Sequence, residues 1–180
     1  MSQTIQIAKF GNPVLREVAR FLDLNDIRSE TIQELITNLF KYLEGDTYGV
    51  GISAPQIGQS VALSVINIKP TPTLPDLQPR SLVIINPKII GTVGEKKNMW
   101  EGCISSGEGK NSLCAKVPRP NTLRLEWLDE NGVSHDEVFD GFIAHTIAHE
   151  VDHLNGVLFV DRVEDPKTYM LLSEFEKQNL

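Results

Sequence analysis

The sequence GFIAHTIAHEVDHLNG, residues 141–156, decides how this chain is interpreted, because it contains the pattern H-E-x-x-H at residues 149–153. Residues four apart in an α-helix lie on the same face, so His149 and His153 can present two imidazoles to one metal ion. Glu150 is turned partly away from that face, where a carboxylate can reach a metal-bound water without binding the metal. The pattern therefore predicts a metal-binding helix with a carboxylate beside the metal.

The residues around this pattern predict a helix that begins after Asp140 and ends near Gly156. Apolar residues recur at the spacing expected of one buried flank. Gly156 suits a helix end because glycine tolerates the left-handed cap conformation. A core helix that carries surface histidines is the competing interpretation, and the helical context of the motif argues against it. The apolar residues of the flank are Phe142, Ile143, Ile147, Val151 and Leu154.

His145 extends the row of histidines by one further turn. His145 and His153 are eight residues apart, which is roughly 12 Å of helix rise, whereas metal–nitrogen bonds are about 2.0–2.1 Å long. One metal therefore cannot bind all three histidines. We expect His145 to be a neighbour of the site and not a ligand.

The bulk properties are those of an ordinary globular protein. The chain has 180 residues, of which 41% are hydrophobic and 23% charged, and this length suggests one domain over residues 1–180. A net charge of −7 disfavours nucleic acid or an anionic membrane as the main partner. No apolar run approaches membrane-spanning length, and the N-terminus does not match a secretory signal. Cys103 and Cys114 make no disulfide framework, so we expect a cytoplasmic protein. We expect Cys114 to be a buried residue of a strand.

Local patterns place the strands between two helices. A helix is expected over residues 29–44, with Ser29 as its N-cap. Residues 157–163 are expected to form a short strand, and residues 166–178 a helix that begins at Pro166. This order, in which strands do not alternate with helices, predicts an α+β fold. Loops are expected over 49–58 and 70–80, and strands over 61–68, 82–86, 88–93, 121–128 and 134–139.

A catalytic site needs a third protein ligand beside the two histidines. In the metzincin pattern it would be a histidine, but Phe159 occupies that position. In a thermolysin-like protease it would be Glu164 or Glu174, and neither lies in a convincing second ligand helix. Cys103 is the third option, because thiolates bind zinc and iron well. The competing interpretation of Cys103 is a small buried hydrophobic residue.

The glycine-rich loop formally matches the dinucleotide fingerprint G-x-G-x-x-A at residues 49–54. That fingerprint must open a helix, and Pro55 removes a backbone donor that the helix would need. The loop could instead pair its backbone with an extended peptide, and the Gln56 amide could donate a hydrogen bond to an oxyanion. A plain structural turn is the competing interpretation.

Three stretches, GVGISAPQ at 49–56, EGCIS at 101–105 and HEVDH at 149–153, resemble the three signature motifs of the peptide deformylase family and occur in the same order. Residues 12–16 and 117–119 fit the same family. The resemblance covers nearly the whole chain. It implies an α+β fold in which antiparallel or mixed sheets pack around a central HExxH helix.

The resemblance also implies a role for each matching residue. The family binds one divalent metal, usually Fe²⁺, with Zn²⁺ or Ni²⁺ as substitutes. A glutamate acts as general base and acid, while an amide side chain and a backbone N–H hold the formyl oxygen. The implied metal ligands are Cys103, His149 and His153, and the implied catalytic residues are Glu150, Gln56 and Ile104.

The same resemblance places the substrate. Gly51 would pair with the peptide backbone, and the methionine side chain would enter a pocket lined by Val50, Phe142, His145 and Thr146. We expect His145 to be a neutral wall of this pocket, because a positive charge close to a divalent cation is disfavoured.

Some positions depart from the family pattern. Ser53 replaces the usual alanine, which we expect to be harmless. Residues 106–116 form a longer and more glycine-rich link than is usual in the family. Residues 174–176 include two glutamates, whereas a ribosome-docking tail would be basic. Glu101 and Arg119 retain an expected supporting ion pair.

The sequence thus predicts a hydrolase that removes the formyl group from formyl-methionyl nascent chains, with transient ribosome contact and no binding to specific nucleic acid sequences or to membranes. Two alternatives stay open. One is an HExxH metallopeptidase, and the other is a deformylase-like protein that binds such peptides without turnover.

Overall fold

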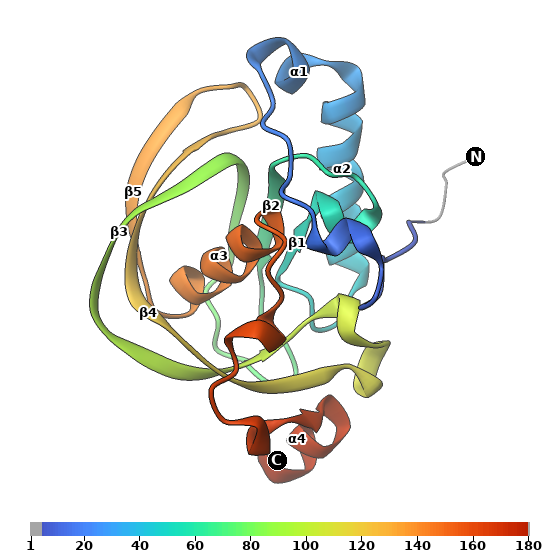
Figure 1. Ribbon diagram of the computed structural model, residues 1–180, viewed down its shortest axis with the longest axis vertical. Coiled ribbons are helices and arrows are strands. Elements are labelled where there is room, and N and C mark those ends of the chain that lie inside the picture. The colour runs from blue at the N-terminus through green and yellow to red at the C-terminus, as the bar shows by residue number, and fades with distance from the viewer. Residues whose placement is uncertain (1–4, 180) are drawn as a thin grey trace.

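The computed structural model describes residues 5–179 and has the expected α+β architecture, with helix α3 enclosed by a curved antiparallel sheet (Figure 1). The sheet order is β1-β2-β3-β4-β5, and β6 pairs with β4. The helices are α1 (Leu24–Arg28), α2 (Glu30–Gly45), α3 (Gly141–Leu154) and α4 (Leu172–Asn179). The strands are β1 (Gly51–Ser53), β2 (Leu63–Ile68), β3 (Arg80–Gly102), β4 (Leu113–Leu128), β5 (Ser134–Asp140) and β6 (Met170–Leu171).

Helix α2 confirms the helix predicted over residues 29–44. The hydroxyl of Ser29 accepts a hydrogen bond from the backbone N–H of Ile32 at 3.3 Å, which is the expected N-cap contact. Ile36, Leu39 and Leu43 are buried and pack towards β1 and β2. One apolar core therefore lies between α2 and the sheet.

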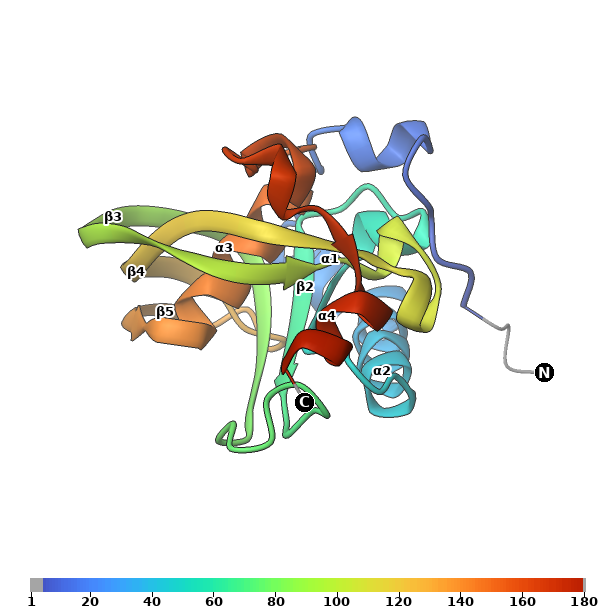
Figure 2. The same cartoon turned by 90° about the horizontal axis from the view of Figure 1, so that it is seen from below.

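Strands β3 and β4 are much longer than the sequence predicted and form a curved ribbon (Figure 2). The pieces expected at 82–86 and 88–93 belong to one strand, whose register shifts between Ile85 and Lys88. Pro87 cannot donate to the ladder, so the strand passes it as an irregularity. Asn86 has a φ of +51°, and its side chain bonds the backbone of Leu22 at 2.9 and 2.7 Å. These bonds offset the strain of that conformation.

The glycine-rich segment 49–58, expected to be a loop, instead contains β1 and a 3₁₀-helix, Ala54–Ile57. Strand β1 exists because it pairs with β2, a contact between segments that local patterns do not reveal. Gly58 ends the 3₁₀-helix with a φ of +81°.

Two predictions for the C-terminal part are wrong. The strand expected at 157–163 is a 3₁₀-helix, Phe159–Arg162, because the Asp161 carboxylate accepts a hydrogen bond from the Leu158 N–H at 2.8 Å and turns the chain. The helix expected over 166–178 is interrupted: Pro166 does begin a 3₁₀-helix, Pro166–Thr168, but the α-helix starts only at Leu172. The two preceding residues, Met170 and Leu171, pair as β6 with the edge of β4, which overrides their local helical preference.

Helix α3 passes through the centre of the molecule, as predicted for the metal-binding helix (Figure 1). Ala144 and Ile147 pack against β2, β3, β4 and β5 in a second apolar core. Asn155 caps the helix and Gly156 follows with a φ of +71°, which confirms the predicted end. In the described part of the chain, no helix is long and apolar enough to cross a membrane.

Candidate metal centre and peptide cleft

The side chains of Cys103, His149 and His153 converge at one point. Their ligand atoms all lie within 4.8 Å of one another, and Cys103 Sγ is 3.4 Å from His153 Nε2. A tetrahedral site with bonds of about 2.0–2.3 Å places its ligand atoms roughly 3.3–3.8 Å apart. A thiolate with two imidazoles also suits zinc or iron. The three residues therefore fit one divalent metal ion, and His145 is not among them.

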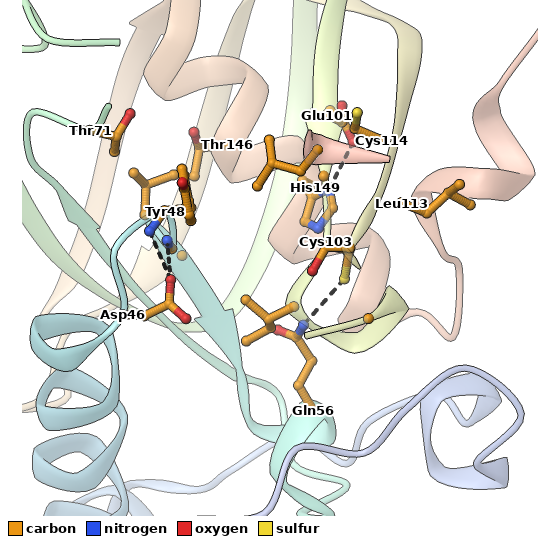
Figure 3. Close-up of a pocket in the computed structure, with 18 of the residues that line it drawn as sticks. Asp46, Tyr48, Gln56, Thr71, Glu101, Cys103, Leu113, Cys114, Thr146 and His149 are labelled. Carbon is orange, nitrogen blue, oxygen red and sulfur yellow. Dashed lines mark hydrogen bonds and ion pairs between the residues drawn. The ribbon is translucent and has the colours of Figure 1, made fainter. Parts of the chain in front are cut away.

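Glu101 orients the first histidine of the pattern. Its Oε2 lies 2.7 Å from Nδ1 of His149, which leaves the other ring nitrogen for a metal (Figure 3). Arg119 donates to the same carboxylate from Nε and, at 3.1 Å, from Nη2, as the expected ion pair requires. Burial acts to raise the pKa of Glu101, but its hydrogen bonds with His145, His149 and Arg119 hold that pKa well below its usual value.

His145 faces both the cleft and this carboxylate. It lines the cleft, and its Nε2 also forms a close contact with Glu101 Oε1. That second contact could not be predicted from local patterns, since Glu101 lies on β3 and His145 on α3.

Glu150 is buried against β1. The hydroxyl of Ser53 donates a hydrogen bond of 2.5 Å to Glu150 Oε2, and a Cβ atom at Gly51 would stand only 2.5 Å from Glu150 Oε1. Burial raises the pKa of Glu150, against the opposing effects of the His149 charge and the Ser53 hydrogen bond. Ser53, which the sequence treated as a harmless replacement, is therefore in direct contact with the expected general base.

Gln56 is fixed with its amide NH₂ towards Cys103. The backbone N–H of Ser53 donates to Gln56 Oε1 at 2.8 Å, which assigns the other amide atom as the donor. Gln56 Nε2 then lies 3.5 Å from Cys103 Sγ (Figure 3). It also lies 3.2 Å from Ser105 Oγ. A donor held in this way can face an oxygen bound near the metal.

The loop that carries Ile104 is held by the N-terminal segment. Lys9 Nζ donates to the carbonyl oxygens of Ile104 at 3.0 Å and Gly107 at 2.6 Å, and the Phe10 N–H donates to the Ser105 carbonyl at 2.9 Å. The sequence analysis missed Lys9, because nothing in its local pattern relates it to residue 104.

Two glycines direct backbone groups into the cleft. The Val50 carbonyl accepts a bond from the Asn67 N–H at 2.9 Å, so the next antiparallel pair, Gly51 with Ile66, is a non-hydrogen-bonded one. The polar backbone groups of Gly51 therefore face away from β2.

The same argument applies to β3. The Lys116 N–H of β4 bonds Thr168 instead of β3, so the pair of Trp100 with Lys116 is non-hydrogen-bonded. Gly102 is two residues further along, and its backbone groups likewise face away from β4. The sequence singled out Gly51 but missed Gly102, which stands directly before the cysteine.

These groups line one cleft of about 970 Å³. All the residues expected in the methionine pocket belong to its wall, namely Val50, Phe142, His145 and Thr146. The cleft is also lined by Trp100 of β3 together with Leu172 and Phe175 of α4. The contribution of α4 to the cleft could not be predicted, because local patterns indicate a helix over 166–178 but not where that helix packs.

Comparison with known proteins gives one consistent result. A family model described as polypeptide deformylase matches residues 4–169. A peptide deformylase from Leptospira biflexa serovar Patoc is 35% identical over 171 residues, covering 91% of this chain and 90% of that protein. Peptide deformylase 2 from Nostoc sp. is 35% identical over 178 residues, covering 97% and 94%.

Solved structures agree. A class I type b peptide deformylase from Acinetobacter baumannii with bound Met-Ala-Ser superposes with a TM-score of 0.83 at 32% identity, covering 91% of this chain and 100% of that one. A peptide deformylase from Synechococcus elongatus in complex with actinonin gives a TM-score of 0.77 at 32% identity, covering 99% and 88%.

Proposed function

The chain belongs to the polypeptide deformylase family of metal-dependent enzymes, which remove the N-formyl group from nascent peptides, and we propose that it does so with Cys103, His149 and His153 as metal ligands and Glu150 as general base. The observation that carries this proposal is the convergence of one thiol and two imidazoles beside a buried carboxylate.

We infer that the ligands hold Fe²⁺, with Zn²⁺ or Ni²⁺ as substitutes; the donor set suits these ions, and the family resemblance favours iron. When bound, such an ion would polarise the formyl carbonyl and would lower the pKa of a water molecule towards about 7. Glu150 accepts the proton of the attacking water and passes it to the leaving amine. Gln56 Nε2 and the backbone N–H of Ile104 donate to the formyl oxygen as it gains charge.

The peptide binds as an extended strand in this scheme. Gly51 of β1 and Gly102 of β3 each direct backbone groups away from the neighbouring strand and offer them to the peptide, in the manner of strand addition. The methionine side chain then enters the pocket lined by Val50, Phe142 and Thr146, where an unbranched thioether fills irregular space well.

The proposal extends to the cellular setting. Residues 1–180 act as one catalytic domain in the cytoplasm and meet formyl-methionyl chains in transient contact with the ribosome. The strand edges in the cleft support an encounter with nascent chains, because the free end of an unfolded chain can pair with such edges.

A metallopeptidase is the weaker alternative. Among residues 5–179, the only cluster suited to a metal contains Cys103, and neither Glu164 nor Glu174 joins it. A downstream carboxylate ligand, as in thermolysin-like proteases, is therefore not favoured by the geometry.

Formate release from formyl-Met-Ala-Ser tests the proposal. The metal-loaded protein should release formate. Glu150→Ala should keep its metal, measured by elemental analysis, and lose roughly 10²–10⁴-fold in kcat. Cys103→Ala should lose both metal and activity. Formyl peptide binding without formate release from metal-loaded protein would identify a binding protein, and a metal-free Glu150→Ala would make Glu150 a ligand.

A further inference from the structure

The N-terminal segment of residues 8–10 crosses two of the segments that form the candidate site. The Ala8 N–H donates to the Gln56 carbonyl at 2.7 Å, and the Phe10 N–H donates to the Ser105 carbonyl at 2.9 Å. Figures 1 and 2 both show this segment beside the turn that follows β3. Consecutive Cα atoms are about 3.8 Å apart, so those of Ala8 and Phe10 are less than roughly 8 Å apart. The segment therefore ties the backbone of Gln56 closely to the loop after β3.

Lys9 lies between these two attachments and binds the same loop with its side chain. It is half-buried and lines the cleft, and its Nζ donates to the carbonyl oxygens of Ile104 at 3.0 Å and Gly107 at 2.6 Å. Hydrogen bonds from a charged donor are stronger than those between neutral groups. One ammonium thus joins the first residue of the 3₁₀-helix Ile104–Ser106 to the residue after it.

The direction of the Ile104 N–H depends on how this turn is held. The Cys103 carbonyl and the Ile104 N–H belong to one planar trans peptide and point in opposite directions. The Cys103 carbonyl accepts hydrogen bonds from the Ser106 N–H at 2.9 Å and the Ser106 hydroxyl at 2.7 Å. Both peptide groups that flank the Ile104 Cα atom are therefore held, the first inside the turn and the second by Lys9.

Phe10 anchors the segment that carries Lys9. The centroids of the Phe10 and Phe159 rings are 6.1 Å apart, and the Phe159 ring is stacked at 6.3 Å from the ring of His149. Phe10 packs against the apolar cluster that contains Phe159 and Cys103. Lys9 therefore holds the turn from a segment that is itself packed beside the proposed metal ligands.

We propose that Lys9 is a positioning residue for the donors to the formyl oxygen: it fixes the turn that begins at Ile104 and so sets that N–H opposite the Gln56 amide. The inference rests on the proposed deformylase activity and adds to it a residue that acts through another. Removal of one such donor lowers kcat by about 10²–10³-fold, and displacement should cost less, so we expect a loss of roughly tenfold without the ammonium.

Steady-state kinetics with formyl-Met-Ala-Ser test this role. Lys9→Met keeps an unbranched side chain without its donors, so kcat should fall roughly tenfold while KM and metal content stay unchanged. Lys9→Gln keeps an N–H donor without the charge and should lose less. Lys9→Arg keeps both the donors and the charge and should restore most of the activity.

Gln33→Met is the matched control. Gln33 Nε2 also bonds two backbone carbonyls of separate segments, those of Ile27 and Glu130, each at 2.8 Å. It does not belong to the wall of the cleft. This variant should lose stability in urea and keep its kcat.

A binding measurement separates this inference from the proposed function. A tetrahedral phosphonate analogue of the formyl peptide presents a charged oxygen to the donors, whereas the product Met-Ala-Ser does not. In metal-loaded Lys9→Met, the Kd of the phosphonate should rise roughly tenfold and that of Met-Ala-Ser should stay unchanged, as measured by calorimetric titration. That result in a protein whose wild type releases no formate would support the role of Lys9 and overturn the deformylase activity.

Three outcomes would overturn the role of Lys9. An unchanged kcat in Lys9→Met would show that the turn holds its place without the ammonium. A higher KM at unchanged kcat would show that the ammonium contacts the substrate directly. Equal losses of kcat in Lys9→Met and Gln33→Met would show a stabilising contact and no more. If Lys9→Met does not fold, as judged by circular dichroism, the comparison of Lys9→Gln with Lys9→Arg decides.

Discussion

Ser53 shows how much a single hydroxyl can contribute to this site. It donates to Glu150 Oε2 at 2.5 Å and lies 2.8 Å from the hydroxyl of Ser64. The carboxylate of Glu150 is therefore held by a neighbour on β1 and not only by burial. Comparison with the family pattern treats alanine and serine at this position as equivalent. In the structure, however, the serine hydroxyl forms a hydrogen bond with Glu150 that alanine could not form.

We predict that Ser53→Ala lowers kcat roughly tenfold, because one hydrogen bond to a charged group contributes about 1.5–3 kcal/mol. KM and metal content should stay unchanged, since neither the cleft nor the ligands are altered. Steady-state kinetics and elemental analysis measure the three quantities. Ser64→Ala is the control, as it leaves the Glu150 contact intact; an unchanged kcat in Ser53→Ala would mean that burial alone positions Glu150.

The two cysteines should differ in reactivity. Burial raises the pKa of the Cys114 thiol to about 11, so only on the order of one thiol in a thousand is ionised at pH 8. Cys103 lies at the metal centre and lines the cleft. Susceptibility to oxidation follows thiolate character and access.

We predict that iron-loaded protein loses activity in air faster than nickel- or zinc-loaded protein, with oxygen added at Cys103. Peptide mass spectrometry after exposure to air locates the modification. Oxidation confined to Cys114, or equal half-lives for the three metals, would contradict this expectation.

At the scale of elements, Arg119 joins three parts of the fold. From β4 it bonds Glu101 of β3, and its Nη1 donates to Asp152 of α3 at 2.7 Å. Arg162 completes the set with a bond of 2.8 Å to Asp152. The helix that carries the histidines is therefore tied, through buried charges, to the strand that ends directly before Cys103.

We predict that Arg119→Ala destabilises the protein by about 3–5 kcal/mol, because it removes the buried cation that Glu101 and Asp152 share, leaving Glu101, among the described residues, only its histidine contacts and Asp152 only its pair with Arg162. Urea denaturation of the metal-free protein measures the loss. Arg124→Ala is the matched control on the same strand: its pair with Asp136 is exposed, so it should cost less than about 1 kcal/mol. Equal losses in the two variants would refute a structural role for the buried network.

The elements that the sequence predicted well are those whose signals are local. Helix α2 is marked by apolar spacing and by the Ser29 cap, and α3 by its glycine end. Strands β1 and β6 escaped detection, because each is defined by its partner strand and not by its own residues. The two histidines of the candidate metal centre follow from motif spacing and Cys103 from the family resemblance, whereas the contacts of Ser53 and Lys9 could not be predicted, since they join distant segments.

For the molecule as a whole, a bound metal should act as a cross-link between β3 and α3. A ligand at 100 times its Kd stabilises the native state by about 2.7 kcal/mol. For a protein of this size that corresponds to a rise in Tm of roughly 5–10 °C. We therefore predict that chelation with EDTA lowers Tm by this amount and that added Ni²⁺ restores it. Calorimetry measures both, and the Tm of Cys103→Ala should respond to neither.

The strand edges in the cleft also bear on the solubility of the protein. An exposed strand edge is a template for edge-to-edge aggregation. Here the cleft-facing groups of Gly51 and Gly102 lie on facing walls, and the Tyr48–Glu176 hydrogen bond joins the segment before β1 to α4. A second folded copy would have to insert a whole hairpin between these walls, while a single extended chain enters end first. A chain end that enters the cleft can therefore pair with these edges, whereas the fold of a second copy hinders the same pairing.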